Sequence, residues 1–446
     1  MVSVPGVKTA YPRGSFNAHW FSLFNAISFQ IMMGAPIILY AKFLGASSTV
    51  LGIIAAFTPL MTVFQLPAAQ HLERYGYRQF VLMGWGTRTI LIFVVAAIPL
   101  AGFLDSTSKL AVLLSVLFFF NLLRGISSAA WMPWITQLIP ESARGRFLSV
   151  DQFFMYGGCL ISLLVSALVM AGRVEPWEYA LVFLISALGG SVSLGFIKRI
   201  PEVPAGESTR RSSQEVPWRE MLAYPPFREL LTFNLIYATV LGSLGVFTVE
   251  FLRDFSHFEI GSVLYLSAFS FVGALAALPF CGPVVDATGS KPLMRVATVM
   301  FAIVIVVWIL IAASVLPCSL ALVAALNFLA GAASANFNLA NVRITMATMP
   351  EMGRNHFFAL FTVITSLGLG GAPIGWGMIL DAIGSYEAVT GLFHWKRHSI
   401  YFLALLALNA IAFAYIPRLH ESAGLRGGET SLGYARSRRS PGFRSR

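Results

Sequence analysis

Long apolar stretches separated by short polar segments dominate the chain. A membrane-spanning helix needs about 20 mostly apolar residues, because each residue adds about 1.5 Å of rise across a hydrocarbon core of roughly 30 Å. The apolar runs do not alternate with polar positions, for example over 112–123, so the strand pattern of a membrane barrel is excluded. We expect twelve spanning helices, at 17–41, 48–69, 80–102, 110–138, 148–171, 178–197, 228–251, 260–280, 293–314, 318–346, 357–380 and 399–417.

A polar segment divides these runs into two sets of six. It is rich in charged and turn-forming residues, among them Pro204 and Gly206, which is typical of a linker. At its end, residues 216–227 fit either a short interfacial helix or a plain lead-in to the next span. The predicted parts are an N-terminal six-helix half at 1–197, a cytoplasmic linker at 198–222, a C-terminal six-helix half at 223–417, and a disordered, basic cytoplasmic tail at 418–446.

Composition and charge support a membrane protein and give it an orientation. Hydrophobic residues make up 57% of the chain and charged residues 11%, whereas soluble domains carry about 25% charged residues. Of the 31 Lys and Arg residues, 23 fall on the side that holds both termini. The six on the other side are Lys42, Lys109, Arg173, Arg253, Lys396 and Arg397. The positive-inside rule therefore predicts cytoplasmic termini, and we expect a multi-pass protein of the bacterial inner (cytoplasmic) membrane.

The two halves repeat one another. After the second span stands Glu73-Arg74-Tyr75-Gly76-Tyr77-Arg78, and after the eighth stands a segment with Asp286, Gly289 and Lys291. In both, an acid is followed three residues later by Gly and two further on by a base. The fourth and tenth spans share Asn, Gly and Ser at nearly the same spacing, and each is followed by Pro-Glu with Arg three beyond the Glu. The matched positions are offset by 206 to 213 residues, which indicates an internal duplication.

These loops resemble the signature loop of the major facilitator superfamily, which follows its second and eighth helices. The second copy matches at Gly282, Asp286, Gly289 and Lys291, whereas the first has Ala69, Glu73 and Tyr77 at three of the signature positions. The resemblance implies an all-α membrane protein with two six-helix halves related by pseudo-two-fold symmetry. It also implies a secondary transporter that works by rocker-switch alternating access.

The loops then become candidate conformational latches. An acid at the end of one helix can face the positive N-terminus of another, and such a contact breaks when the halves rock apart. Ordinary solvation of a charged loop is the alternative. The latch candidates are Glu73, Arg74, Gly76, Arg78, Glu141, Arg144, Gly282, Asp286, Gly289 and Lys291.

The resemblance implies that the first, fourth, seventh and tenth helices line a central cavity. Polar residues on these helices fall at helical spacing and are costly toward lipid, so each stripe should face the interior of the protein or water. Hydrogen bonding between helices is the alternative role for such residues. The substrate-binding candidates are Asn25, Asn121, Arg124, Asn234, Tyr237, Asn327, Ser334 and Asn338.

Arg124 is the most informative single residue, because a cation near mid-span is costly and needs a partner. No acid lies at the centre of a span, which favours an anionic or polar solute bound by Arg124 over a cation. A structural pair between Arg124 and Asp151 is the alternative. Asp151 is also our candidate for proton coupling, with a salt bridge between helices as its competing role, and protons or another ion remain the expected coupling ion.

The sequence carries no signature of an enzyme or of a metal-binding protein. The chain has no Gly-Lys-Ser/Thr phosphate loop, and His394 and His398 have helical spacing but no third ligand, so we expect no enzyme, cofactor or metal site. The basic residues lie in polar gaps and the tail, so nucleic acid is not an expected partner. The expected partners are the lipid bilayer and a small-molecule solute. A non-transporting scaffold or sensor built on a transporter fold remains the alternative function.

Overall fold

The computed structural model describes residues 12, 14–69, 71–172, 174–203, 218–348 and 354–421, and these are mostly helical. Among them are twelve helical spans long and apolar enough to cross a membrane, so the predicted number of spans is confirmed. The first six are built from α1 (Asn17–Met33), α2 (Ala35–Phe43), α3 (Ser48–Thr62), α4 (Gln65–Ala69), α5 (Leu72–Tyr75), α6 (Tyr77–Ala97), the short 3₁₀ helix η1 (Ile98–Leu100), α7 (Ser106–Leu138), α8 (Glu141–Val169) and α9 (Pro176–Ile197).

The second half repeats this order after α10 (Trp218–Ala223). The short α10 falls within 216–227, for which a short helix was one of the two interpretations of the sequence. The remaining elements are α11 (Pro225–Asp254), α12 (Ile260–Thr288), α13 (Ser290–Ala312), α14 (Leu320–Thr348), α15 (Arg354–Ile383), β1 (Glu387–Thr390), β2 (Phe393–Lys396), α16 (Arg397–Tyr415) and η3 (Ile416–Arg418).

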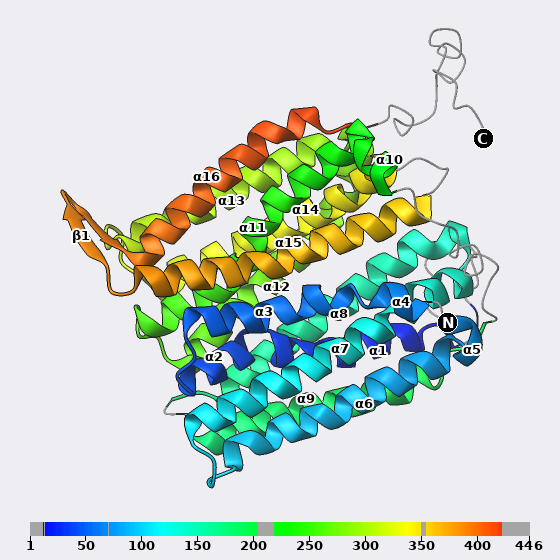
Figure 1. Ribbon diagram of the computed structural model, residues 1–446, viewed down its shortest axis with the longest axis horizontal. Helices are drawn as coiled ribbons and strands as arrows, with labels where there is room; N and C mark the ends of the chain where they lie inside the picture. The colour runs from blue at the N-terminus through cyan, green and yellow to red at the C-terminus, as the bar shows by residue number, and fades with distance from the viewer. Residues whose placement is uncertain are drawn as a thin grey trace.

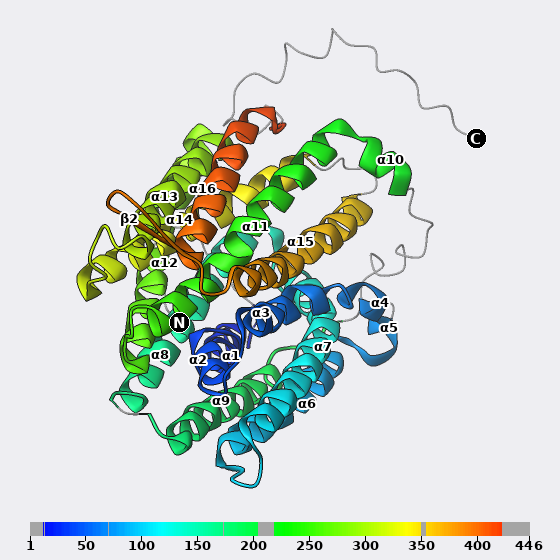
Figure 2. The same ribbon diagram turned by 60° about the vertical axis from the view of Figure 1, so that its left-hand side comes forward.

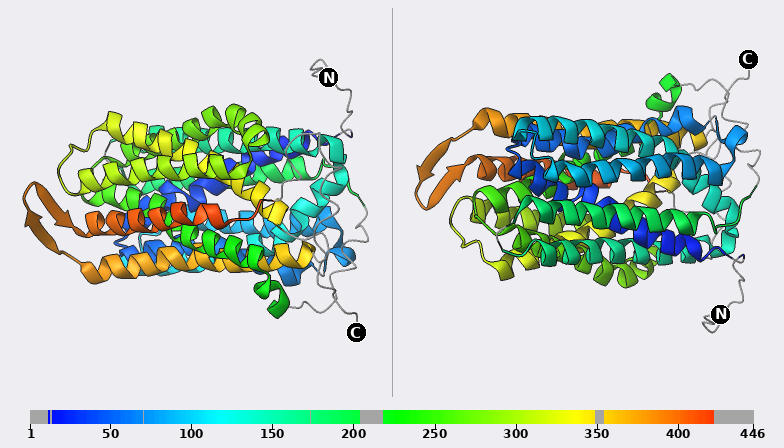
Figure 3. Two further views of the ribbon diagram at one scale, coloured as in Figure 1. Left: turned by 90° about the horizontal axis from the view of Figure 1, so that it is seen from above. Right: turned by 90° about the horizontal axis from the view of Figure 1, so that it is seen from below.

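The two halves lie side by side with their helices running in roughly the same direction (Figures 1 and 2). A β-hairpin between α15 and α16 pairs Glu387 with Lys396 and Thr390 with Phe393, and it extends past the helices at one end of the bundle (Figure 3). The sequence predicted no secondary structure for this segment, which lies between the spans expected at 357–380 and 399–417. We call this end of the molecule the hairpin end; α4, α5 and α10 lie at the opposite end (Figure 1).

The first span breaks in the middle. Gly34 separates α1 from α2, and an added Cβ there would lie 2.4 Å from the carbonyl oxygen of Gln30. Pro36 stands in the first turn of α2, where its missing N–H costs no helical hydrogen bond. The chain therefore bends next to the place where the two halves meet.

The repeated loops share one backbone geometry. Gly76 has φ 72° and Gly289 has φ 85°, a region that residues with a side chain rarely adopt. A glutamate shortly after the last span of the same half then caps the helix that follows each glycine. Glu202 Oε1 accepts a hydrogen bond from Arg78 N at 3.1 Å, and Glu421 Oε1 accepts one from Ser290 N at 2.7 Å.

The two halves contact each other mainly through α3 against α15 and α8 against α12. Glycines permit this close approach. An added Cβ at Gly52 would lie 2.2 Å from the carbonyl oxygen of Pro373, and one at Gly377 would lie 2.4 Å from that of Ser48. At the hairpin end, a Cβ on Gly261 would lie 2.8 Å from the carbonyl oxygen of Met170.

Large apolar side chains remain exposed on helices at the outside of the bundle. Examples on α6, α9, α13 and α16 are Ile90, Phe93, Leu184, Leu188, Val296, Ile303, Leu403 and Ile411. A soluble monomer rarely exposes such extended apolar surface, whereas helices with saturated backbone hydrogen bonds can present it to lipid. Together with the twelve apolar spans, this surface defines an integral multi-pass membrane protein.

Candidate functional site

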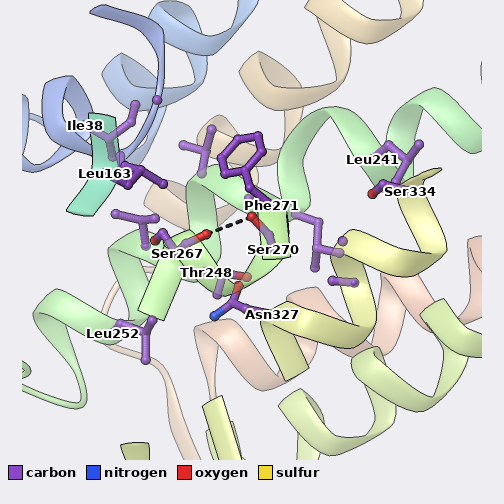
Figure 4. A pocket seen from close by; sticks show the side chains of 18 of the residues that line it. Ile38, Leu163, Leu241, Thr248, Leu252, Ser267, Ser270, Phe271, Asn327 and Ser334 are labelled. Carbon is purple, nitrogen blue, oxygen red and sulfur yellow. Dashed lines mark hydrogen bonds between the residues drawn. The ribbon is translucent and has the colours of Figure 1, made fainter. Parts of the chain in front are cut away.

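A cavity of about 350 Å³ lies between the two halves. The first half contributes residues around the break between α1 and α2, together with Leu163 of α8. The second half contributes residues of α11, α12, α13 and α14. Figure 4 shows polar side chains of this cavity, among them Thr248, Ser267 and Asn327, set among apolar groups such as Leu163 and Phe271. The cavity therefore has walls that would separate if the halves moved apart.

The lining is apolar with a few uncharged polar groups. Its polar side chains are Gln30, Thr248, Ser267, Ser270, Asn327 and Ser334. Its aromatic side chains are Phe271, Phe301 and Trp308. No charged side chain of the described part of the chain is among its lining residues.

A cluster of charged residues joins the two halves at the hairpin end. Lys42 Nζ lies 2.6 Å from Asp254 Oδ2 and 3.7 Å from Glu250 Oε1. Glu250 is fully buried, and it accepts hydrogen bonds from Ser48 Oγ at 2.6 Å and from Arg397 Nη2 at 2.9 Å. Lys42 and Ser48 belong to the first half, and the other three residues belong to the second. A buried carboxylate needs such compensation, because an unpaired buried charge is strongly unfavourable.

A third carboxylate, from α15, adds contacts between the two halves. Asp381 accepts hydrogen bonds from the backbone N–H groups of Ser48 at 3.0 Å and Thr49 at 2.8 Å. These are unsatisfied donors in the first turn of α3, where a negative charge also interacts favourably with the helix dipole. We call Lys42, Ser48, Glu250, Asp254, Asp381 and Arg397 the hairpin-end network.

This network was not predicted from the sequence. Among its members, only Lys42 and Arg397 were singled out there, as basic residues on the outer side. The partners come from opposite halves, so the pairing depends on how the halves pack and not on any spacing along the chain.

Two of the eight predicted substrate-binding residues, Asn327 and Ser334, line the cavity. Asn25 instead accepts a hydrogen bond from Arg88 Nη2 at 2.5 Å, and Arg88 is 1% exposed. Asn121 is fully buried and accepts a hydrogen bond from Thr58 Oγ1 at 2.9 Å. Both contacts join helices within the first half, which is the alternative role that the sequence left open.

The remaining candidates on α11 and α14 lie outside the cavity lining. Asn234 Oδ1 accepts a hydrogen bond from Asn341 Nδ2 at 2.8 Å. The ring of Tyr237 stacks on Phe337 with 3.7 Å between the ring centroids, and Tyr237 is buried. Asn338 is exposed and its side chain interacts with that of Tyr156 of α8, so it lies where α14 approaches the first half.

Arg124 is half-buried, and its guanidinium lies 4.5 Å from the centroid of the Phe29 ring. No ion pair joins it to a carboxylate of the described residues. Asp151, its predicted alternative partner, instead accepts a hydrogen bond from Ser22 Oγ at 2.6 Å and lies 3.4 Å from His19 Nδ1. The structure therefore brings Asp151 together with α1 and does not bring it to Arg124.

The described latch side chains make contacts within their own half or with the segment directly after its last span. Arg78 Nε lies 3.0 Å from Glu202 Oε2, and Lys291 Nζ donates to the carbonyl oxygen of Pro417 at 3.3 Å. The guanidinium of Arg74 lies 5.6 Å from the centroid of the Tyr75 ring. The candidates whose side chains or immediate surroundings lie outside the described residues are Glu73, Glu141, Arg144, Gly282 and Asp286.

A second, larger hollow of about 570 Å³ lies beside α8 and α12. Its lining includes Leu168, which is 78% exposed, and Tyr265, which is 50% exposed. Its lining is mostly apolar, and such exposed apolar side chains suit a surface that contacts lipid. The cavity between the halves is the better candidate for a solute, because polar groups of both halves converge on it.

Comparison with known families identifies the class of protein. The Major Facilitator Superfamily model matches residues 20–263 and 250–441, so the chain belongs to this superfamily. The two matches agree with the duplication seen in the sequence. The fold and the twelve spans are those of a multi-pass transporter of this superfamily.

Solved structures share the fold. A single-residue mutant of the nucleoside transporter NupG has a TM-score of 0.70 at 12% identity, over 92% of this chain and 100% of that one. A D-xylose-proton symporter has a TM-score of 0.69 at 14% identity, over 90% and 96% of the two chains. The inward-open xylose transporter XylE from E. coli has a TM-score of 0.69 at 14% identity, over 92% and 96%. A comparison with curated protein sequences finds no match.

Proposed function

We propose that this protein is a secondary active transporter that moves a small polar solute across the membrane by rocker-switch alternating access. One observation carries the proposal: both halves line one cavity, and a network of charges joins the same two halves at one end. A site between two repeats becomes accessible from alternate sides when one repeat rocks against the other. In this conformation the hairpin-end network holds the halves together beside the cavity.

The network has the properties expected of a reversible gate. Ion pairs with partly exposed side chains contribute only about 0–1 kcal/mol each, and Lys42 and Asp254 are 15% and 28% exposed. A few such contacts suffice to bias an equilibrium between two conformations without locking it. Glu250 is fully buried, so separating it from its partners costs more free energy than separating any other member of the network. A proton or a new partner would reduce this cost by compensating its charge.

The orientation proposed from the basic residues places the hairpin end outside and both termini in the cytoplasm of a bacterial inner membrane. Labelling of single cysteines with a membrane-impermeant reagent tests it. We expect a cysteine in place of Thr390 to react from outside the cell, and one in place of His420, whose side chain is 61% exposed, to react only after lysis. Reaction of both from the same side would contradict the twelve-span topology.

From the sequence, we expected Arg124 to bind an anionic or polar solute. Arg124 has no carboxylate partner among the described residues, which supports a role for it along the solute path. The lining of the cavity itself favours the polar class over the anionic class, because its polar side chains are uncharged. We therefore propose a polar solute and treat an anion contact at Arg124 as the competing hypothesis.

Asp151 is the proposed residue for proton coupling. Its carboxylate is 16% exposed and contacts Ser22 and His19, which is 5% exposed, so two titratable groups meet within the membrane-spanning part of the first half. A proton shared by this pair would change the contact between α1 and α8. The competing role is a structural contact between these helices, which would leave uptake in Asp151→Asn with the pH dependence of the wild type.

Counterflow tests transport directly. Purified full-length protein is reconstituted into liposomes loaded with unlabelled solute, and we expect uptake of labelled solute above that of protein-free liposomes. A scaffold or sensor built on this fold would bind the solute without counterflow, which would contradict the proposed function.

A further inference from the structure

The cavity contains a buried hydroxyl group that lacks a partner. Thr248 of α11 lines the cavity, is 7% exposed, and its Oγ1 has no hydrogen-bond partner among the described residues. A buried hydroxyl without a partner costs about 1–3 kcal/mol, so natural structures rarely leave one unused. The partner that would satisfy it has to enter through the cavity.

The polar side chains of α12 and α14 that line the cavity use only part of their hydrogen-bonding capacity within the protein. Ser267 Oγ donates to the carbonyl oxygen of Val263 at 2.8 Å, and Ser270 Oγ donates to that of Ser267 at 2.7 Å, so both hydroxyl oxygens keep free lone pairs. Asn327 Nδ2 donates to the carbonyl oxygen of Val323 at 3.1 Å, which leaves its Oδ1 as an acceptor. Acceptor oxygens therefore remain on the α12 and α14 sides, where Figure 4 draws the side chains of Ser267, Ser270 and Asn327.

Gln30 adds both kinds of group from the first half of the protein. Its side-chain amide carries two donors and one acceptor oxygen, and the residue lines the cavity beside the α1–α2 break. A solute that satisfies this set has to donate to several acceptors and also accept from Gln30 or Thr248. A hydroxyl group does both, whereas a carboxylate or a phosphate offers mainly acceptors and an ammonium group offers only donors.

The rest of the lining consists mainly of apolar and aromatic side chains, with Phe271, Phe301 and Trp308 among them. Such a wall suits the apolar face of a ring. An ion in this cavity would lose its hydration with no opposite charge among the described lining residues, and that loss is far larger than the loss for a hydroxyl group. The carboxylate of Glu250 does not line the cavity and is already bound by Ser48 and Arg397.

We propose that the cavity binds an uncharged ring compound that has hydroxyl groups along one edge of the ring and an apolar ring face. The hydroxyl groups would bond to Thr248, Asn327 and the two serines of α12, and the ring would lie against the aromatic side chains. This inference rests on the proposed transport function for its physiological meaning, but the binding preference is a property of the cavity and is measured separately.

Matched ligands isolate the effect of charge. Calorimetry on the purified full-length protein uses glucose, phenyl glucoside and adenosine as uncharged probes, with glucuronate and glucosamine as charged analogues of glucose. We expect at least one uncharged probe to bind and charged analogues to bind at least tenfold more weakly than their uncharged counterparts. Equal or tighter binding of a charged analogue, or no binding by any uncharged probe, would overturn the proposal.

Two variants locate the site. Thr248→Val keeps the shape of the side chain and removes the hydroxyl, whereas Thr232→Val does the same on α11 outside the cavity, at a hydroxyl already bonded to Arg228 O at 2.9 Å. We expect Thr248→Val to weaken binding of the hydroxylated probe about tenfold, or roughly 1.4 kcal/mol, and Thr232→Val to leave it unchanged. Equal affinities in the two variants would overturn the assignment of the site.

The inference and the proposed function fail in different ways. Binding of an uncharged probe with the Thr248 dependence, but without counterflow in liposomes, would refute transport of that solute and leave the cavity assignment intact. Counterflow restricted to anionic solutes would support transport and refute the uncharged class.

Discussion

Lys42 and Asp254 approach to 2.6 Å across the boundary between the two halves, and this ion pair lies in the network that joins the halves at the hairpin end. Within its own half, Asp254 lies farther from a cation, at 4.0 Å from Arg397 Nη2. The Lys42–Asp254 pair therefore reports on the relative position of the halves, and removing it should shift their equilibrium more than it changes folding.

Asp254→Asn tests this role. We expect the variant to fold and to populate the conformation that is open at the hairpin end several-fold more, because the lost pair favours the closed state. A cysteine in place of Gly245 is the reporter, since Gly245 lines the cavity and an added Cβ meets nothing within 4 Å. The measurement is the rate of its reaction with an impermeant maleimide added from the outside.

Glu387→Gln is the matched control. It removes a carboxylate at the same end, but Glu387 pairs with Lys396 of the same hairpin at 3.9 Å. We expect no change in the rate at which the reporter is labelled. Equal rates in Asp254→Asn and the parent protein would remove the gate role from the Lys42–Asp254 pair.

Asp381 and Asp105 provide a second comparison. Both accept hydrogen bonds from backbone N–H groups in the first turn of a helix, but Asp381 reaches across to α3 whereas Asp105 caps its own helix α7. Loss of such a contact leaves donors of the first turn unsatisfied and removes a favourable interaction with the helix dipole. We expect Asp381→Ala to speed labelling of the Gly245 reporter and Asp105→Ala to leave it unchanged, with both variants lowering the melting temperature. The opposite ranking would exclude Asp381 from the joint between the halves.

The repeated glycines give a prediction about stability. Gly76→Ala and Gly289→Ala place a side chain at positive φ and within 3.3 Å and 3.2 Å of the capping carboxylates of Glu202 and Glu421. We expect each to destabilise the protein by about 1 kcal/mol or more. Gly86→Ala, in the interior of α6 with nothing within 4 Å, should instead stabilise it by roughly 0.5–1 kcal/mol. Thermal unfolding in detergent measures all three, and a stabilising Gly289→Ala would contradict this account of the loop.

Arg124→Gln separates the two hypotheses for the charge of the solute. If the solute is uncharged, we expect affinity to change less than about tenfold, with any loss arising from the contact between Arg124 and Phe29. A direct anion contact would instead cost about 1.5–3 kcal/mol, and Arg124→Lys would restore only part of it. Isothermal titration with the solute that shows counterflow distinguishes these outcomes.

The sequence predicted the parts of the fold that depend on local pattern. Twelve apolar runs, the duplication and the two glycine turns are all visible in the chain, because span length and backbone conformation are properties of short segments. The capping residues Glu202 and Glu421 could not be assigned, since each reaches its helix only after the other helices of its half have packed. The β-hairpin at 387–396 was likewise missed, because the segment is short and lies between two long apolar runs.

The cavity was predictable only in part, for the same reason. Asn327 and Ser334 emerged from the helical stripe on α14, but Asn25 and Asn234 have the same polar character and bond to Arg88 and Asn341 instead. Helical spacing indicates that a residue faces the interior of the protein and does not indicate which neighbour it meets there. Thr248 carries no signal in the sequence beyond its position among apolar residues.

Alternating access requires the two halves to separate at the hairpin end for solute to pass. Cysteines in place of Ala171 and Ser262 lie on opposite halves and line one hollow, and they leave the hairpin-end network intact. Cysteines in place of Leu168 and Ala171, within the first half, form the control pair. The measurement is counterflow in liposomes before and after joining each pair with a short bifunctional thiol reagent, and again after reduction. We predict that joining Ala171 to Ser262 stops counterflow reversibly and that joining the control pair does not; undiminished counterflow with the two halves joined would contradict alternating access.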